Sequence, residues 1–321
     1  MAKKIAVGIA TRKRPKLLDG CLTSLASIKI PKQAELCFII VENDEKLTIE
    51  PVIEKFKPKL IASGKKQASI HVGFEPEIGI PSARNKVMDI AMAAKCDFLA
   101  FIDDDERART DWLVELMKVQ VNTNADLVGG PVWRIRDPSE NFGLFQRMVS
   151  KALLQHYNKS KPRKMRRTSI IATGNWLCCM RFVEENLLRF DTSLQLTGSE
   201  DVKFDKDLVA AGGCKAWTEN AVVEEIVTAD RASLNYIFTR ERETQKTLYL
   251  VKQKYRKGYL YAIGEIFLMA LFGILCRVIL VPFDNGRSLV KIIMKAGRLT
   301  GHIEAVFGHS GSNIYRTVTG D

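Results

Sequence analysis

Apolar and polar residues alternate along the first half of the chain with two different periods. Helices are expected where apolar residues recur three and four positions apart, over 16–27, 81–94 and 110–121. Strands are expected at short continuous apolar runs, at 5–10, 36–41, 68–72 and 97–102. These elements follow one another in βαβ order, which predicts a parallel sheet with helices on both faces and hence an α/β fold.

The carboxyl-terminal third carries two apolar segments that also contain charges. Residues 259–283 are long enough to span a bilayer, but Glu265 and Arg277 interrupt the run, and a charge held in hydrocarbon costs about 2.5–3.5 kcal/mol. We therefore expect this segment to lie in a membrane interface. Residues 286–308 mix Lys and Arg with spaced Leu, Val, Ile and Met, which is typical of an interfacial helix and equally of an amphipathic helix packed on a domain.

Length and composition indicate a folded protein with an anionic partner. The 321 residues are 46% hydrophobic, enough for one large domain with an appendage, which excludes disorder throughout. The formal net charge of +12 favours a nucleotide, a lipid phosphate, a membrane surface or a nucleic acid as partner. The seven cysteines show no CxxC spacing, so we expect reduced core residues in a cytosolic protein. The first apolar run is too short for a signal peptide.

The segment "FIDDDE" (101–106) places four consecutive acids at the carboxyl end of a predicted strand, where open α/β sheets bind ligands. Such neighbours repel one another unless a cation, a basic side chain or open water offsets them, and their oxygens suit Mg²⁺ or Mn²⁺. A divalent-ion site is one interpretation. The other is a solvated acidic turn before the helix that starts near Thr110.

Further polar residues follow the other predicted strands. They are Thr11 and Arg14, the "VEND" segment (41–44), and Arg84 with Asn85. Each falls at the edge where a nucleotide would lie in such a sheet. The usual dinucleotide, P-loop and zinc-protease motifs (GxGxxG, GxxxxGK and HExxH) do not occur.

Taken in order, these segments resemble glycosyltransferase family 2, whose members have the GT-A fold. The resemblance rests on "IAVGIATRKRP", "FIIVENDE", "GIPSARN" and "FIDDDE", followed by "ATGNWL" (172–177) and "LTGSEDVKFDKDLVAAGG" (196–213). It covers about residues 3–230. The segment "VVEEIVTADRASLNYIFTRE" and the basic, apolar tail are similar to bacterial exopolysaccharide transferases of the succinoglycan-assembly kind.

The resemblance implies a division of the chain and an activity. A GT-A catalytic domain would occupy 1–235, with a nucleotide-sugar half (1–130) and an acceptor half (131–235), and 236–321 would form a helical, membrane-associating region. The implied enzyme is inverting and metal-dependent. It would move a hexose, with glucose favoured, from a UDP-sugar to a polyprenyl diphosphate-linked saccharide in exopolysaccharide biosynthesis. We expect it at the cytoplasmic face of the inner membrane, peripheral or monotopic on an anionic membrane surface, with no nucleic-acid partner.

The resemblance also implies the donor site. The ion, Mg²⁺ or Mn²⁺, would be held by Asp105 with Asp103. Glu106 has no role in the family pattern and is expected at the surface. The family usually has two aspartates where this chain has Glu42 and Asn43, which leaves the nucleotide base open. The residues expected to hold the nucleotide sugar are Thr11, Arg14, Glu42, Asn43, Asp44, Arg84, Asp103 and Asp104.

For the acceptor, the resemblance implies that Asp201 is the base that takes the hydroxyl proton, and Glu200 would orient the acceptor or that base. Gly198 would allow close approach of the sugar, and Asn175 and Trp176, with Trp217, would line the groove. The same residues have simpler interpretations. "SED" is also a helix amino-terminal cap, and a tryptophan is more often core packing than a sugar platform.

Two other functions remain open. A nucleotidyltransferase also uses metal-binding carboxylates, but it normally has a glycine-rich, lysine-bearing loop near its amino terminus, and "ATRKRPKLL" lacks the glycines. A non-enzymatic basic adaptor for membrane or nucleic acid would leave "ARN", "DDD" and "SED" unexplained as a set.

Overall fold

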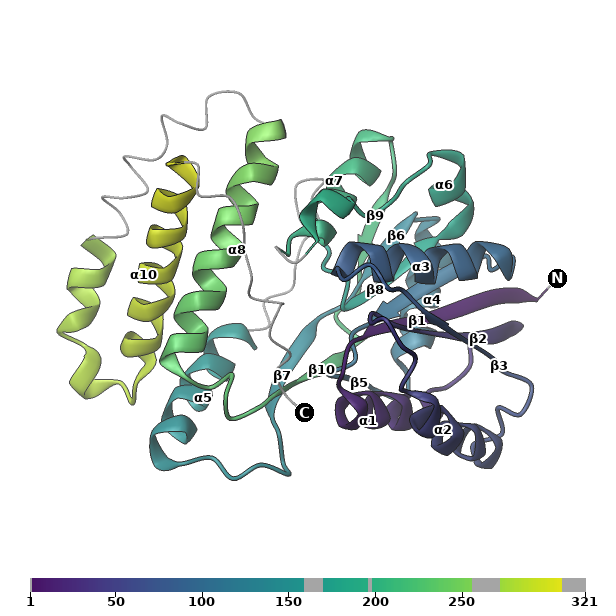
Figure 1. The fold of residues 1–321 in the computed structure, drawn as a ribbon, viewed down its shortest axis with the longest axis horizontal. Helices are drawn as coiled ribbons and strands as arrows, with labels where there is room; N and C mark the ends of the chain where they lie inside the picture. Colours follow the sequence, from purple (N-terminus) through teal and green to yellow (C-terminus); the bar gives the residue numbers. More distant parts are fainter. Residues whose placement is uncertain (1, 159–169, 196–197, 256–271, 308–321) are drawn as a thin grey trace.

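The computed structural model describes residues 2–158, 170–195, 198–255 and 272–307 (Figure 1). Its centre is a sheet of seven strands in the order β3-β2-β1-β4-β8-β6-β9. The first four strands in that order pair in parallel, as the βαβ rhythm predicts, whereas β8 runs antiparallel to both β4 and β6. The strands are β1 (Lys3–Thr11), β2 (Ala34–Glu42), β3 (Ser69–Phe74), β4 (Phe98–Ile102), β6 (Leu127–Gly129), β8 (Asn175–Cys179) and β9 (Lys215–Trp217).

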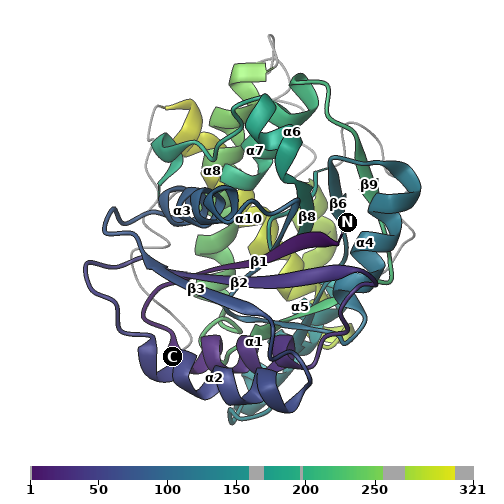
Figure 2. The same ribbon diagram turned by 90° about the vertical axis from the view of Figure 1, so that its right-hand side faces the viewer.

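Helices cover both faces of this sheet (Figure 2). Along β1, β2 and β4, alternate side chains enter two separate cores, as the two-residue period of a strand requires. One core is closed by α1 (Pro15–Ala26), α2 (Glu50–Ala62) and α4 (Trp112–Thr123). The other is closed by α3 (Ile80–Ala93), α6 (Met180–Glu185) and α7 (Glu200–Ala210). The α/β prediction is therefore confirmed.

One helix of the first half, α2, was not predicted from the pattern. Its buried positions Val52, Ile53, Phe56 and Leu60 have helical spacing, but Pro58 lies inside the helix. A proline removes one backbone hydrogen bond and normally ends a helix, so it masks the periodic signal. Packing of Phe56 edge-on against Phe38 of β2, with ring centroids 5.2 Å apart, holds α2 in place.

A second sheet of three strands lies beside the carboxyl ends of the main sheet. In it β10 (Val223–Val227) pairs antiparallel with β5 (Glu106–Ala108) and parallel with β7 (Val132–Arg136). Its register places Glu225 opposite both Glu106 and Arg134. The small sheet thus joins the acidic segment to the second half of the chain.

Two carboxyl-terminal helices and α5, from the middle of the chain, form a third core beside the sheets (Figure 1). The three helices are α5 (Leu144–Tyr157), α8 (Leu234–Tyr255) and α10 (Arg287–Val306). The predicted helix 286–308 is confirmed as α10, and Val290 and Met294 bury its apolar face against α5 and α8. A short 3-10 turn, η3 (Val281–Phe283), precedes it, and another, η1 (Thr192–Leu194), precedes α7.

Two glycines allow α8 and α10 to approach closely. A side chain at Gly297 would collide with the carbonyl oxygen of Phe238, and one at Gly301 with that of Arg242. Small residues four positions apart lie on the same face of a helix, so both contacts belong to one seam. Of the two interpretations of 286–308, the structure shows the amphipathic helix packed on the rest of the protein.

Within the described parts of the chain, no helix is both long and apolar enough to cross a bilayer. Much of 259–283 falls in 256–271, outside the described residues, as does the basic stretch 159–169. One cysteine prediction needs correction: Cys214 and Cys276 are exposed, whereas Cys21, Cys37, Cys96 and Cys178 are buried. All seven are free thiols, as expected.

Candidate active site

A cavity of about 470 Å³ lies at the carboxyl edge of β1, β2 and β4, between the sheet, α7 and α8. It has the size of a small-molecule site. Most of the residues predicted from sequence reach its wall, although they come from segments up to 190 positions apart (Thr11 to Asp201). They are Thr11, Arg14, Asn43, Arg84, Asp103, Asp104, Asp105, Gly198, Glu200 and Asp201.

Asp104 is bound from the end of β1 and the start of α1. Thr11 donates its hydroxyl to the carboxylate at 2.7 Å, and an Arg14 guanidinium nitrogen lies 3.0 Å from it. Burial raises the pKa of Asp104 to about 6, even though Arg14 favours the charged form. Thr11 and Arg14 therefore hold the acidic loop as well as lining the cavity.

Asp105 has a strong partner that the sequence did not indicate. Arg231, in the loop between β10 and α8, lies 2.6 Å from its carboxylate, and Arg14 lies at 3.7 Å. Burial acts to raise the pKa of Asp105, but the two guanidinium groups outweigh it and the pKa is lowered. Basic neighbours thus offset the repulsion within the acidic segment.

Glu106 is not a surface residue, so that prediction is wrong. It is 3% exposed and its carboxylate accepts the backbone N–H of Asp103 at 2.9 Å. Pairing of β5 with β10 carries it inward, and Gly174 packs so closely on it that any side chain at 174 would strike the carboxylate. Burial, with Asp103 and Asp105 nearby, raises the pKa of Glu106 well above its usual range.

Arg84 joins two of the sequence motifs. Its guanidinium lies 3.0 Å from Asp103 of the "DDD" segment and also forms an ion pair with Glu200 of the "SED" segment. At 7% exposure it is not the solvated helix arginine that the sequence alone allowed. A single buried guanidinium thus fixes the two acidic motifs relative to each other.

Glu200 and Asp201 open α7 at the wall of the cavity. Burial raises the pKa of Glu200 to about 7, assisted by the Asp201 charge and opposed by Arg84. The second carboxylate oxygen of Glu200 is buried and has no hydrogen-bond partner among the described residues. The chain enters the helix through Gly198, at φ +77°, which glycine adopts without strain. Ser199 makes no side-chain cap, but the Asp201 carboxylate accepts the Val202 N–H of the first turn at 2.7 Å.

The segment after β2 reaches the cavity only in part. Asn43 lines it while donating to the carbonyl oxygens of Glu75 and Glu77 and accepting the Gly79 N–H at 2.8 Å, so it shapes the loop before α3. Glu42 is fully buried and accepts from the Thr48 hydroxyl at 2.6 Å and from the Thr48 N–H. Asp44 pairs with Lys13 at 3.1 Å. Neither Glu42 nor Asp44 is part of the cavity wall.

Asn175 and Trp176 were expected in an acceptor groove, and the structure places both in the interior instead. The Asn175 carbonyl accepts from the Trp112 indole at 2.8 Å, and its amide donates to two backbone carbonyls. Trp176 packs among Phe101, Phe190 and Phe204. Trp217 is half-buried and donates to Glu219 at 2.7 Å. The core-packing interpretation holds for Trp176.

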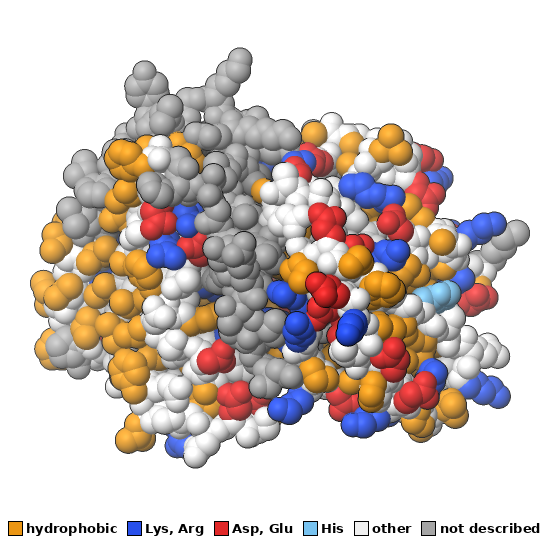
Figure 3. Space-filling model, viewed as in Figure 1, with side chains coloured by type: hydrophobic (Ala, Val, Ile, Leu, Met, Phe, Trp, Pro, Cys, Tyr) orange, Lys and Arg blue, Asp and Glu red, His pale blue; other side chains and the backbone are white. Residues whose placement is uncertain are grey.

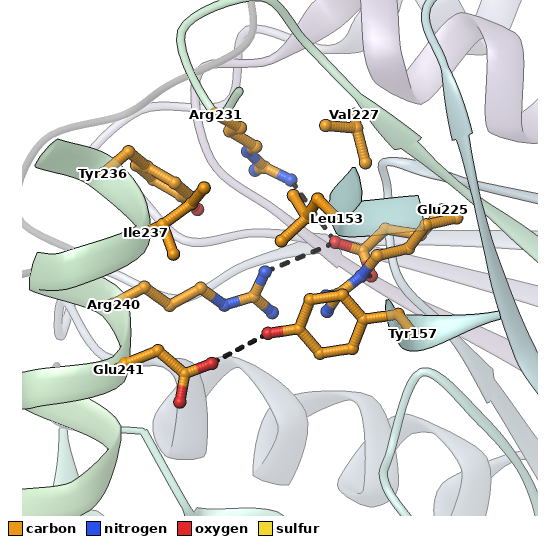
Figure 4. Close-up of a pocket in the computed structure, with 10 residues that line it drawn as sticks. Leu153, Tyr157, Glu225, Val227, Arg231, Tyr236, Ile237, Arg240 and Glu241 are labelled. Carbon is orange, nitrogen blue, oxygen red and sulfur yellow. Dashed lines mark hydrogen bonds and ion pairs between the residues drawn. The ribbon is translucent and has the colours of Figure 1, made fainter. Parts of the chain in front are cut away.

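Sequence reasoning missed the wall that α8 and the small sheet provide. A smaller adjoining pocket shares Arg134, Glu225, Arg231, Tyr236 and Arg240 with this wall (Figure 4). The charged residues of the wall are Arg134 of β7, Glu225 of β10, Arg231, and Arg240 of α8. A possible signal was the four-residue spacing of Tyr236, Arg240, Thr244 and Leu248, which all line the cavity. The predicted domain boundary at 235 falls at the start of this helix.

Asp103 and Asp105 fit a divalent ion that takes its other ligands from water and from the phosphates of a substrate. Among the described residues, no group of three or more His, Cys, Asp or Glu side chains converges as a metal cage. Mg²⁺ is commonly bound through one or two carboxylates, waters and substrate phosphates. Asp103, whose side chain is 43% exposed, and Asp105 supply two carboxylates on one short loop, which fits that pattern.

Sequence comparisons with known proteins bear on the family of this chain. The family model described as glycosyl transferase family 2 matches residues 6–187. The succinoglycan biosynthesis protein ExoM of Rhizobium meliloti (strain 1021) is 31% identical over 258 residues, 76% of this chain and 73% of that protein.

Two solved structures resemble the fold. The mannosyltransferase PcManGT from Pyrobaculum calidifontis, in complex with GDP-Man and Mn²⁺, aligns with a TM-score of 0.63 at 13% identity, covering 97% of this chain and 89% of its own. S. aureus TarS 1–349 in complex with UDP aligns with a TM-score of 0.50 at 14% identity, covering 95% and 91%. At these identities the two likenesses establish the fold alone.

Proposed function

Because the chain belongs to glycosyl transferase family 2 and has the GT-A fold, we propose that it is an inverting enzyme that moves a hexose from a UDP-sugar to a lipid-linked saccharide. Glucose is the hexose we favour. The observation that carries the proposal is the double contact of Arg84, which sets the donor-side Asp103 and the acceptor-side Glu200 around one cavity. Neither a nucleotidyltransferase nor a non-enzymatic adaptor accounts for this family membership.

The donor would lie over β1, β2 and β4. Thr11, Arg14 and Asn43 line that end of the cavity, and Arg84 offers positive charge for the diphosphate. The solved structures hold UDP in TarS and GDP-Man in PcManGT, and we propose UDP as the nucleotide for this chain. Asp103 and Asp105 would hold Mg²⁺ or Mn²⁺, which as a Lewis acid stabilises a departing diphosphate when it is bound.

Transfer requires one proton to move. An acceptor hydroxyl attacks the anomeric carbon while Asp201 accepts its proton, the bond from that carbon to the diphosphate oxygen breaks, and the nucleoside diphosphate leaves with the electron pair. Attack from the face opposite the leaving group inverts the anomeric centre. Glu200, held by Arg84, orients the first turn of α7 that carries Asp201.

The acceptor we propose is a polyprenyl diphosphate-linked saccharide at the cytoplasmic membrane face. The relative ExoM is a succinoglycan biosynthesis protein, and family membership supports a role in exopolysaccharide assembly. The net charge of +12 and the exposed apolar side chains between 272 and 283 support attachment to an anionic membrane surface.

The direct test is a screen of nucleotide sugars, beginning with UDP-glucose, for hydrolysis and transfer in the presence of Mn²⁺ or Mg²⁺. Slow donor hydrolysis needs no acceptor, so it reports the donor even before the acceptor is known. We expect UDP-glucose to be consumed and the chelator EDTA to suppress its consumption. A folded protein that neither binds nor turns over any nucleotide sugar would contradict the proposal.

Asp201→Asn tests the base. We expect transfer to fall by about 100-fold or more, the scale of a lost general base, while UDP affinity stays near the wild-type value. Asp207→Asn is the matched control, because Asp207 lies in the same helix, paired with Lys203 and outside the cavity wall. If Asp201→Asn transfers at the wild-type rate, the base is another residue.

A further inference from the structure

One end of the cavity is lined by a face of α8. Tyr236, Arg240, Thr244 and Leu248 recur every four residues, so their side chains lie along the same side of the helix. Opposite them, β7 contributes Arg134, and Figure 4 shows the Arg240 side chain extending from α8 toward Glu225. These residues lie outside the segment matched by the family model, 6–187, except for Arg134.

Positive charge exceeds negative charge at this end. Glu225 lies 2.7 Å from Arg134, 3.7 Å from Arg240 and 4.0 Å from Arg231. One carboxylate therefore faces three guanidinium groups, and Arg231 also lies 2.6 Å from a second acid, Asp105. The nearby Glu241 is already engaged by the Tyr157 hydroxyl at 2.8 Å and by Arg298 at 2.5 Å.

Two of the arginines hold donors that nothing described accepts. Arg134 Nη1 and Arg231 Nε are buried without a hydrogen-bond partner among the described residues. Buried donors are nearly always satisfied, so such atoms indicate a partner from outside the chain, either an oxyanion or an ordered water. The Arg134 guanidinium lies 3.6 Å from the centre of the Tyr157 ring, which fixes its plane, and Arg240 remains one-third exposed.

This end is separate from the residues proposed for the donor. Arg231 bridges Asp105 to Glu225, and Glu225 in turn contacts Arg134 and Arg240. Arg240 is thus three ion-pair steps beyond Asp105, on the side of α8, whereas Thr11, Arg14 and Arg84 lie on the sheet side. A sugar passing from donor to acceptor would cross from one group to the other.

We propose that Arg134 and Arg240 form a second anion-binding subsite, which takes an oxyanion carried by the acceptor. That oxyanion is either the diphosphate of a lipid-linked saccharide or a carboxylate on one of its sugars. Planar guanidinium groups bind both kinds of oxyanion through paired hydrogen bonds. The inference rests on the proposed transferase function and names the part of the acceptor that the protein holds.

The test is a calorimetric titration with two probes, geranyl diphosphate and the methyl glycoside of glucuronic acid. Saturating UDP and Mg²⁺ fill the donor site, so neither probe reports on it. We expect one probe to bind the wild-type protein and Arg240→Gln to weaken that binding about tenfold or more, the loss expected for a charged hydrogen bond. The probe that binds identifies the oxyanion.

Arg298→Gln is the matched control. Arg298 of α10 pairs with Glu241 of α8, the helix that carries Arg240, but Arg298 does not line the cavity. This variant should bind the probe with the wild-type affinity, and Arg240→Lys should recover part of the binding by restoring the charge. Thermal melts of each variant separate lost binding from lost folding.

Three results would overturn the subsite. They are failure of both probes to bind the wild-type protein, equal losses in Arg240→Gln and Arg298→Gln, and displacement of the probe by UDP. Failure of the proposed function gives a different result: UDP itself does not bind. The probes are then titrated without UDP, and the same comparison of the two variants decides whether the subsite exists.

Discussion

At the residue scale, the site is organised by shared guanidinium groups. Arg14 forms ion pairs with Asp104 and Asp105, Arg84 with Asp103 and Glu200, and Arg231 with Asp105. Burial strengthens the contacts of Asp104, Asp105 and Glu200, since few water molecules compete for their charges, whereas Asp103 is 43% exposed. This difference in burial gives two predictions about stability.

The Asp105–Arg231 pair should be worth several kcal/mol to folding. Both side chains are close to fully buried, at 11% and 8% exposure, so removal of the acid leaves the buried Arg231 with the more distant Glu225, at 4.0 Å, as its ion-pair partner. We expect Asp105→Ala to lower the free energy of unfolding by about 3–5 kcal/mol, as measured by urea denaturation. Asp103→Ala is the control: its side chain is 43% exposed and Arg84 keeps Glu200, so the loss should be about 1 kcal/mol or less. Equal losses would mean that Arg231 does not depend on Asp105.

Glu200 should make stability depend on pH in a defined direction. Its folded-state pKa is raised to about 7, whereas an unfolded glutamate titrates near about 4.3. Between these values the folded protein keeps a proton that the unfolded chain releases, so stability falls as the pH rises. Between pH about 4.5 and about 8, the free energy of unfolding of the wild type should fall by about 2–3 kcal/mol relative to that of Glu200→Gln, because a change of one pKa unit is worth about 1.4 kcal/mol. A difference that is flat or rises over this window would contradict the shift.

At the element scale, the close seam between α8 and α10 shapes the cavity wall. Gly297 and Gly301 let α10 press against the backbone of α8, whose other face carries Arg240 and Thr244 into the cavity. Val290 and Met294 add apolar contacts to α5 and α8. The position of α10, far from the sequence motifs, thus helps to set the position of the cavity-lining face of α8.

Gly301→Ala tests this seam. At a solvent-exposed position inside a helix, alanine in place of glycine adds about 1 kcal/mol of stability. At a tightly packed position, the extra methyl group costs about 1–3 kcal/mol. Because a Cβ at 301 would collide with the Arg242 carbonyl oxygen, we expect a net loss in urea denaturation. Ile303→Ala, at an exposed position of α10, should change stability by about 0.5 kcal/mol or less. A gain in Gly301→Ala would show that the helices are not in close contact.

At the scale of the whole molecule, apolar side chains gather on the side of the carboxyl-terminal helices (Figure 3). Between 272 and 283 the exposed ones are Phe272, Leu275, Val278, Ile279, Leu280 and Phe283, and Phe307 at the end of the described chain is 76% exposed. Single exposed apolar residues are ordinary, but a contiguous set marks an interaction surface. We propose an anionic membrane as the partner of this surface, because the formal net charge of +12 would attract it.

Vesicle sedimentation tests this surface. We expect the protein to pellet with vesicles that contain anionic phosphatidylglycerol and to be released largely by high salt, because surface charge attraction is screened. Replacing Ile279 and Phe283 by glutamate together should reduce pelleting severalfold. Ile61→Glu, at an exposed apolar site on α2, should not. Equal pelleting of all three proteins would place the membrane contact elsewhere.

The α/β class and most first-half elements could be predicted because their signals are local. Apolar periodicity decides strand or helix, and the order of the "ARN", "DDD" and "SED" segments decides the family. Parallel strands also bring their carboxyl ends to one edge by necessity, which is why Thr11, Arg14 and Asp104 are found together as the sequence predicts.

Tertiary structure alone decided which of these residues face the cavity and which partners they have. The burial of Glu106, Asn175 and Trp176 depends on pairing between strands that are distant in the sequence. Pairing of β5 with β10 buries Glu106, and the position of β8 between β4 and β6 buries Asn175 and Trp176. Arg231 and Arg240 reach the acids only because the small sheet and α10 fix the start and the orientation of α8. Such contacts join residues far apart in the sequence, from Gly129 and Trp176 to Asp105 and Arg231, and leave no periodic trace in either segment, so only the folded chain reveals them.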